Sequence, residues 1–355
     1  MNKRILQALL AVVLAVVAVP AWAGSFYRLN GMLDVRDDAV VFTTDDCRVF
    51  TLEISAGDAK KYDGQLVQID GVAKDAIQLT KLSVKAVRPF EKRIEIKDPL
   101  PYKGYQKPAQ IIKLSEKETV VKNVRWSRLK EKNAAGETEF AWRTVKIRPD
   151  LLEASYFIKK PFPPEWLAAH CLMLFTFKKG GMIDENGNES KGLVLSIEAY
   201  QRKDQNYSLK EGLKKTFGVI WLLTTWEDYA AETCHFDTKK LIAYPIKFSA
   251  EQSRKLLLES VRQAGVNRSG EFYHTTRNNC TNNLLVLMNK VGDKKLRFWT
   301  IPSMIYNVRA TMPTMVPKYL QGKGLIGKEL PAVTARTFCR SFPDFSLRSV
   351  QNRHR

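Results

Sequence analysis

Apolar and polar residues alternate along the first part of the chain, between residues 24 and 92. The runs are short and are separated by Gly, Asp and Lys, a pattern typical of β-strands joined by turns. They fall at residues 26–35, 39–45, 47–54, 65–73 and 77–87. Five short strands in so short a segment predict a small all-β barrel over residues 24–92.

A second region changes from strand patterns to helix patterns. Four apolar runs predict strands, at residues 168–177, 192–200, 219–226 and 240–248. The first two flank a turn-rich loop and are expected to form a hairpin. Two helical patterns follow at 249–265, with Ser249 as N-cap, and at 281–291. Strands followed by helices predict an α+β fold, an antiparallel sheet covered on one side.

The rest of the chain is assigned by composition. Residues 93–122 are interpreted as a connector that begins proline-rich, and the α+β unit is expected to span 123–335. Two strand patterns near its beginning lie at 120–129 and 140–147. Beyond Val291 the prolines predict loop and a short helix, and 336–355 is a basic tail.

Residues 1–23 have the pattern of a secretory signal peptide. Lys3 and Arg4 precede an apolar run, and small residues at the end form a cleavage pattern before Gly24. The alternative is an uncleaved anchor. No later stretch approaches the ~20 apolar residues that span a bilayer. The sequence therefore predicts a periplasmic protein with no transmembrane segment in its mature chain.

The charge is unevenly distributed. Basic and acidic residues balance over 24–93, so most of the formal net charge of +20 lies beyond residue 93. Such a surplus favours an anionic partner in the envelope, such as a lipid, a lipoprotein or a cell-wall peptide. Nucleic acid would fit the charge equally well, but the export signal argues against it. A purely solubilising charge is the alternative.

Cys280 is the first candidate for chemistry among five cysteines, an odd number that leaves at least one thiol unpaired within the chain. Asn278 or Asn279 can cap the helix that begins there. The positive end of the helix dipole would then lower the pKa of the thiol, and the free amides could hold an oxyanion. The alternative is a disulfide, with the pairing of Cys47, Cys171, Cys234 and Cys339 left open.

A nucleophilic cysteine requires a base, and His170 is the best of the four histidines because it interrupts the apolar strand 168–177. Strand alternation places His170 and Cys171 on opposite faces, which argues against a role for Cys171. Glu198, on the partner strand, is the natural group to orient the imidazole. Each residue also has a structural alternative: His170 as a core histidine, and Glu198 as a glutamate paired with Arg202 or a nearby lysine.

The stretch from Asn123 to Val291 resembles the family called DUF4105, the Lnb N-terminal periplasmic domain. The resemblance rests on several phrases in the family's order, chiefly KNVRW, AAHCLMLFTF, LVLSIEA, YSLKEGL, KLIAYPIKF and FYHTTRNNCTN. It implies a permuted papain-like thiol fold in which the histidine strand precedes the cysteine helix. The separate phrase GQLVQIDGVAKDAIQLTKLSV resembles exported OB-like barrels.

The resemblance implies that Cys280 is the nucleophile, His170 the base and Glu198 the group that orients the imidazole. Tyr273, His274 and Asn279 surround the cysteine and are expected to bind substrate. The chain departs from the family at Tyr200, where arginine is usual, and at His274, where asparagine is common. The name-giving Lnb proteins are associated with lipoprotein N-acylation and continue into membrane helices that this chain lacks.

The leading hypothesis is a hydrolase or acyltransferase that attacks an amide or ester of the cell envelope through a thioester. The rival hypothesis is a non-catalytic envelope-binding or docking module that uses the basic surface. A third makes the barrel a glycan or nucleic-acid binder. No cofactor is expected, and no metal, because the histidines are few and lack ligand spacing.

Overall fold

The structure is a computed structural model. It describes residues 24–36, 39–74, 79–90, 101–127, 140–166, 168–296, 299–300, 305–306, 312–334 and 337. The expected signal peptide lies outside the described residues, as do Cys339 and, apart from Thr337, the basic tail.

The first five strands close into a barrel. They are β1 (Ser25–Arg36), β2 (Ala39–Thr44), β3 (Val49–Glu53), β4 (Gln65–Ala73) and β5 (Lys81–Pro89). Pairing runs β1-β2-β3-β5-β4 and returns from β4 to β1, with β3 and β5 parallel. All five predicted strands are confirmed. The short helix α2 (Ala56–Lys60), between β3 and β4, was not predicted.

The barrel is filled by the residues that alternate inward along its strands. Leu33, Phe42, Ile69 and Leu82 are fully buried and belong to a core of the barrel's own. At Gly31 a Cβ would lie 2.1 Å from the carbonyl oxygen of Thr43, so only glycine allows β1 and β2 to approach this closely.

A second set of strands forms the sheet of the α+β part. It consists of β9 (Leu152–Pro161), β10 (Ala169–Phe177), β12 (Gly192–Tyr200), β13 (Gly218–Thr225), β14 (Ile242–Pro245) and β15 (Glu271–Phe272). Their order is β14-β9-β10-β12-β13-β15, with antiparallel neighbours throughout. The predicted hairpin of β10 and β12 is confirmed. β9 was missed, because Glu153, Lys159 and Lys160, toward its two ends, interrupt the apolar pattern.

Smaller elements surround this sheet. The strands are β6 (Gln110–Lys113), β7 (Thr119–Ser127), β8 (Ala141–Ile147), β11 (Met182–Asp184), β16 (Trp299–Thr300) and β17 (Ile305–Tyr306). The turns of 3-10 helix are η1 (Pro149–Leu151) and η2 (Glu211–Leu213). β7 joins the main sheet in parallel, with Arg125 opposite Thr224 of β13. β6 and the beginning of β7 fall within the segment expected to be a connector.

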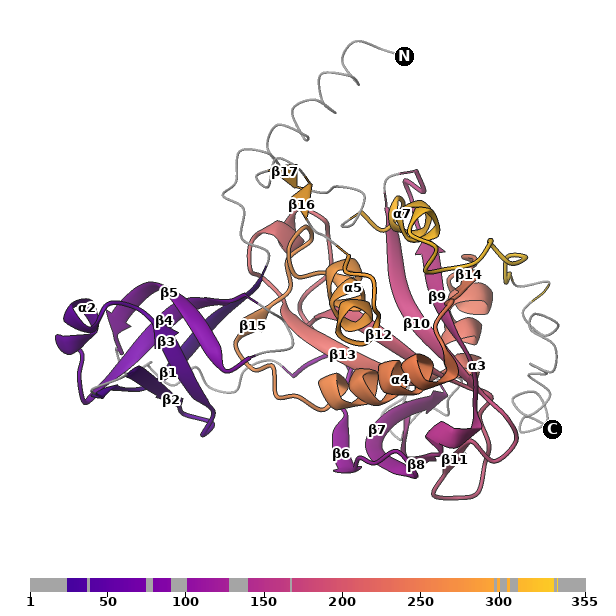
Figure 1. Cartoon of the computed structure of the whole chain (residues 1–355), viewed down its shortest axis with the longest axis horizontal. Coiled ribbons are helices and arrows are strands. Elements are labelled where there is room, and N and C mark those ends of the chain that lie inside the picture. The colour runs from indigo at the N-terminus through magenta and orange to yellow at the C-terminus, as the bar shows by residue number, and fades with distance from the viewer. Residues whose placement is uncertain are drawn as a thin grey trace, which may run out of the picture.

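Helices cover both faces of the sheet, not one as the sequence predicted. Figure 1 shows α4 (Ala250–Ala264) and α5 (Cys280–Val291) on one face of the sheet. α3 (Trp226–Ala230) and a π-helical turn (Ala231–Phe236) lie on the other side. Met173 packs in the core with α4 and α5, whereas Leu172 packs in a separate core with α3. The nearly unbroken apolar runs of β10 and β12 explain this, since a strand buried on both faces needs no polar alternation.

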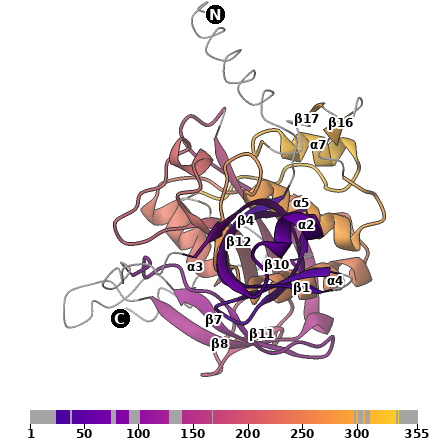
Figure 2. The same cartoon turned by 90° about the vertical axis from the view of Figure 1, so that its left-hand side faces the viewer.

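The ends of the helices follow the sequence closely. Ser249 caps α4, as predicted, and forms a capping box with Gln252. Asn279, one of the two predicted caps, caps α5. The last helix, α7 (Val316–Gly322), is the short helix expected beyond Val291. The barrel joins the sheet where Phe26 of β1 pairs with Phe272 of β15, and Figure 2 looks along this junction from the barrel side.

Candidate functional site

Cys280 is the first residue of α5. The Asn279 side chain accepts a hydrogen bond of 2.9 Å from the amide of Asn282, which leaves the thiol at the positive end of the helix. Cys280 is 2% exposed and carries a free thiol, as do Cys47, Cys171 and Cys234 among the described cysteines. It is therefore an unpaired thiol at a capped helix end.

His170, at the beginning of β10, lies close enough to Cys280 for each side chain to shift the pKa of the other. Burial alone would lower the pKa of His170, but the negative charge and hydrogen bond of Cys280 raise it above its usual value. Burial would likewise raise the pKa of Cys280, but the charge and hydrogen bond of His170 lower it. The opposite shifts describe a pair that favours thiolate and imidazolium.

The other side of the imidazole meets Ser196 rather than a carboxylate. His170 Nε2 lies 2.8 Å from Ser196 Oγ, and Ser196 donates its proton to Glu198 Oε1 over 2.7 Å. A serine hydroxyl has one proton to donate, so Nε2 must carry the proton in the bond to Ser196. This arrangement leaves Nδ1 of His170 as the nitrogen available to the thiol. The sequence placed Glu198 beside His170, but Ser196 was missed.

Glu198 is held as a carboxylate. Burial would raise the pKa of Glu198, yet the charge of His170 and hydrogen bonds from Gln106 and Ser196 lower it. Gln106 Nε2 donates to Glu198 Oε2 over 2.8 Å and to the carbonyl of Ala199 over 3.0 Å. Gln106 lies in the segment interpreted as an irregular connector, so no strand or helix pattern marked it.

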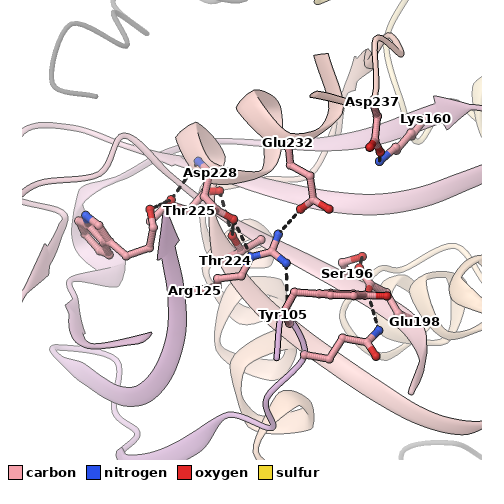
Figure 3. A network of polar contacts seen from close by, with 12 residues as sticks. Tyr105, Arg125, Lys160, Ser196, Glu198, Thr224, Thr225, Asp228, Glu232 and Asp237 are labelled. Atoms are coloured by element: carbon pink, nitrogen blue, oxygen red, sulfur yellow. Dashed lines mark hydrogen bonds and ion pairs between the residues drawn. The ribbon is translucent and has the colours of Figure 1, made fainter. Parts of the chain in front are cut away.

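A buried arginine lies behind this carboxylate. Arg125 of β7 is 1% exposed and donates to Asp228 over 2.7 Å, to Glu232 over 2.5 Å and to the carbonyl of Tyr105 over 3.1 Å. Figure 3 shows the guanidinium between these acids and Glu198. Its charge is among the causes that lower the pKa of Glu198. Arg125 thus connects α3 and the segment around Tyr105 to the site.

Two tyrosines lie against the thiol. Burial raises the pKa of Tyr273 well above its usual value, and the charge of Cys280 adds to the effect. The hydroxyl of Tyr273 lies near that of Tyr207 and near the backbone of Cys280. The two rings meet edge to face with centroids 6.0 Å apart. Tyr273 was predicted from the resemblance; Tyr207 was quoted within a matching phrase, but no role was assigned to it.

His274 and Asn279 shape the loop before α5. Asn279 Nδ2 donates to the carbonyl of Thr275 over 2.6 Å. His274 Nδ1 accepts a hydrogen bond of 3.3 Å from the amide of Thr276. Burial, followed by the charges of Arg277 and Lys215, lowers the pKa of His274 to about 4. His274 is consequently neutral at pH 7.

A buried carboxylate ties the same loop to the barrel. Glu271 accepts hydrogen bonds from Tyr27 over 2.6 Å, from Arg268 over 2.8 Å and from Asn278 over 2.9 Å. Asn278 in turn accepts one from Asn283 of α5 over 2.8 Å. The barrel, the loop and the cysteine helix therefore share one hydrogen-bonded unit.

Cys171 lies closer to the site than strand alternation suggested. Its side chain belongs to the core that contains Cys280, and its backbone amide is among the groups that lower the pKa of Cys280. Burial and the charge of Cys280 raise the pKa of Cys171 well above its usual value. Cys171 therefore stays a neutral thiol, while its backbone helps to hold a thiolate on Cys280.

Residues 139–312 match the family model of the Lnb N-terminal periplasmic domain. The match contains Cys280, His170 and Glu198, and the family's description suggests the periplasm as the location. Neither the curated proteins nor the solved structures compared with the chain contain a significant match. Among the described helices, none has the length and hydropathy to cross a bilayer. Among the described residues, no cluster of three His, Cys, Asp or Glu could hold a metal ion.

Proposed function

We propose that the protein is a periplasmic thiol enzyme, a hydrolase or acyltransferase that acts on an amide or ester of the cell envelope. The observation that carries the proposal is the proximity of Cys280, at a capped helix end, to His170, together with their opposite pKa shifts. A buried structural cysteine shows the reverse behaviour, as Cys234 does: burial raises its pKa to about 12.

The reaction would proceed in two steps. The Cys280 thiolate attacks the substrate carbonyl, and the tetrahedral oxyanion collapses to a thioester as protonated His170 gives its proton to the leaving amine or alcohol. Water, or an acceptor amine or hydroxyl, then attacks the thioester while His170 takes its proton. When the second tetrahedral intermediate collapses, Cys280 leaves as a thiolate and His170 keeps the proton. The starting pair is thereby restored. Atoms and charge balance without any cofactor.

Tyr207 and Tyr273 would serve the oxyanion. The Tyr273 hydroxyl lies near the backbone of Cys280, so the hydroxyl and the Cys280 amide are two donors beside the sulfur. Burial holds both tyrosines in the protonated, donating form by raising the pKa of each. Donors aimed at the developing charge are the usual means of stabilising a tetrahedral intermediate. Asn279 and His274 would border the same pocket for substrate.

We also infer the finer fold types from the topology. A cysteine helix packed on an antiparallel sheet, with the histidine strand earlier in the chain, supports a permuted papain-like domain within residues 123–335. A closed five-stranded barrel with the order β1-β2-β3-β5-β4 supports an OB-like barrel over residues 24–92.

Alkylation of the mature protein tests the thiol pair. Limiting iodoacetamide at pH 6 should modify Cys280 first, and His170→Ala should slow the reaction at least about tenfold because the thiolate is lost. Cys47, the exposed thiol of the barrel, is an internal reference whose rate should not change. Equal rates at Cys280 in both proteins would remove the enzyme proposal and favour the rival, a docking module that binds anionic surfaces.

A further inference from the structure

Cations gather where the barrel meets the loop before α5. Arg28 comes from β1 and Arg88 from β5, while Lys215 precedes β13 and Arg277 lies in the loop. Arg28, Arg88 and Arg277 are the cations that act most strongly on the charge of Lys215. Residues from both parts of the protein therefore contribute to one positively charged junction.

One carboxylate lies within this group of cations. Asp70, whose side chain is 7% exposed, accepts from Arg28 Nε over 2.7 Å and from Arg88 Nη2 over 3.2 Å. The arginine side chains themselves remain 41% and 49% exposed. Asp70 pairs with both arginines and thereby orients their guanidinium groups. A single carboxylate does not balance the cations, so positive charge remains in excess around Lys215.

Lys215 keeps its position although neighbouring cations repel its charge. Its backbone is left-handed, with φ at 51°, a conformation that a residue other than glycine seldom adopts. Its ammonium lies 3.1 Å from the centroid of the Phe26 ring on β1. Burial lowers the pKa of Lys215, and repulsion from Arg28, Arg88 and Arg277 opposes the attraction of Asp70. A bound anion would relieve this repulsion.

The positive region extends to the loop of the nucleophile. Lys215 and Arg277 are the charges that, after burial, lower the pKa of His274 to about 4. His274 follows Tyr273, whose hydroxyl lies near the backbone of Cys280. A group bound at the junction would thus lie beside the loop that shapes the thiol site.

We propose that Arg28, Arg88, Lys215 and Arg277 form a binding site for a phosphate group of the substrate at the junction of barrel and α+β part. Arginine forks pair with phosphate oxygens and lysine supplies a point charge, while a doubly charged phosphate offsets more repulsion than a carboxylate. The assignment to substrate rests on the proposed function, whereas binding of phosphate does not. Arg28 and Arg88 belong to the barrel, so the barrel would supply two of the four cations of the site.

The imidazole of His274 is a built-in reporter of this site. Its pKa can be followed by NMR in the mature protein, with the signal assigned by its loss in His274→Asn. Inorganic phosphate should raise the pKa of His274 by about one unit relative to sodium chloride at equal ionic strength. Lys215→Gln should abolish the phosphate effect. Lys214→Gln is the matched control, since Lys214 pairs with Glu211 over 2.8 Å, and it should keep the effect.

Equal shifts with phosphate and chloride, or a full phosphate effect in Lys215→Gln, would overturn the proposal. The source of the phosphate is tested by sedimentation with vesicles of phosphatidylcholine alone or with phosphatidylglycerol. Binding to the anionic vesicles that Lys215→Gln weakens about tenfold assigns a lipid headgroup; a phosphate effect without vesicle binding assigns a soluble phosphate ester. Alkylation of Cys280 in Lys215→Gln should stay at the wild-type rate, so failure of this site and failure of the thiol pair are distinguishable.

Discussion

The hydroxyl of Tyr27 donates a hydrogen bond of 2.6 Å to Glu271, and both side chains are buried. Tyr27 belongs to the barrel, whereas Glu271 opens the segment that leads to Cys280. The second oxygen of Glu271 accepts from Asn278, next to the residue that caps the cysteine helix. The barrel is therefore built into the geometry of the loop that carries the thiol.

Tyr27→Phe should weaken both stability and the thiol site. Loss of a buried hydrogen bond to a carboxylate lowers the free energy of unfolding by roughly 1.5–3 kcal/mol. Because Glu271 also holds Asn278, alkylation of Cys280 by iodoacetamide should slow as well. Denaturant unfolding and timed alkylation measure the two effects. Tyr62→Phe is the control, since the Tyr62 hydroxyl makes only a 3.4 Å contact with a barrel carbonyl; equal losses in both variants would refute the link.

Ser196→Ala should disturb the imidazole without touching Cys280. In the variant, Nε2 of His170 has no acceptor to fix its tautomer. The hydrogen bonds that connect the imidazole through Ser196 to the carboxylate of Glu198 are also lost. The raised pKa of His170 should fall, so the alkaline limit of the ion pair should move to lower pH in the profile of Cys280 alkylation. Ser155→Ala on the neighbouring strand β9 removes a buried hydroxyl without a partner and should leave the profile unchanged.

Asp228→Asn should destabilise the fold, because it removes one of the two carboxylates that pair with the buried Arg125. Asp228 accepts from Arg125 over 2.7 Å and from Thr224 over 2.8 Å. Leaving a buried charge without any partner costs about 3–5 kcal/mol; Glu232 still pairs with Arg125 in the variant, so the loss should stay below that range, and denaturant unfolding measures it directly. Asp237→Asn is the control, because its pair with Lys160 lies nearer the surface and is worth less than about 1 kcal/mol. A loss of less than about 1 kcal/mol in Asp228→Asn would contradict this role for Arg125.

The sequence predicts elements well where the burial pattern is regular. β10, β12, α4 and α5 have unbroken apolar runs or periodic stripes with capping residues, and each lies where its pattern indicated. These elements carry Cys280, His170 and Glu198, so their meeting could be anticipated from strand pairing. The roles of these residues remain predictions.

Other parts of the site are set by tertiary contacts that no local pattern records. Gln106 reaches Glu198 from an irregular segment, 92 positions earlier in the chain. The link from Tyr27 to Glu271 spans 244 positions. β15 is only two residues long, so it has no periodicity to detect. Such contacts follow from how β1 and β15 pair, which depends on the whole fold.

The neutral His274 should make the protein less stable in weak acid. Its pKa is about 4 in the folded protein and about 6.5 in an unfolded chain, so the unfolded state binds a proton first as the pH falls. Stability should therefore fall between about pH 6.5 and pH 4, by at most about 1.4 kcal/mol per pH unit for this one proton.

Denaturant unfolding of the wild type and His274→Asn at pH 7, 5.5 and 4.5 isolates the effect of this one histidine. Asparagine does not titrate, so the free energy of unfolding of the variant should decline less steeply over this range. The raised pKa of His170 acts in the opposite direction, since its stabilisation is present in acid and is lost as the pH rises through the folded value. His170 is present in both proteins, so its effect cancels in the difference. Parallel declines in the two proteins would show that burial and the charges of Arg277 and Lys215 do not hold His274 neutral.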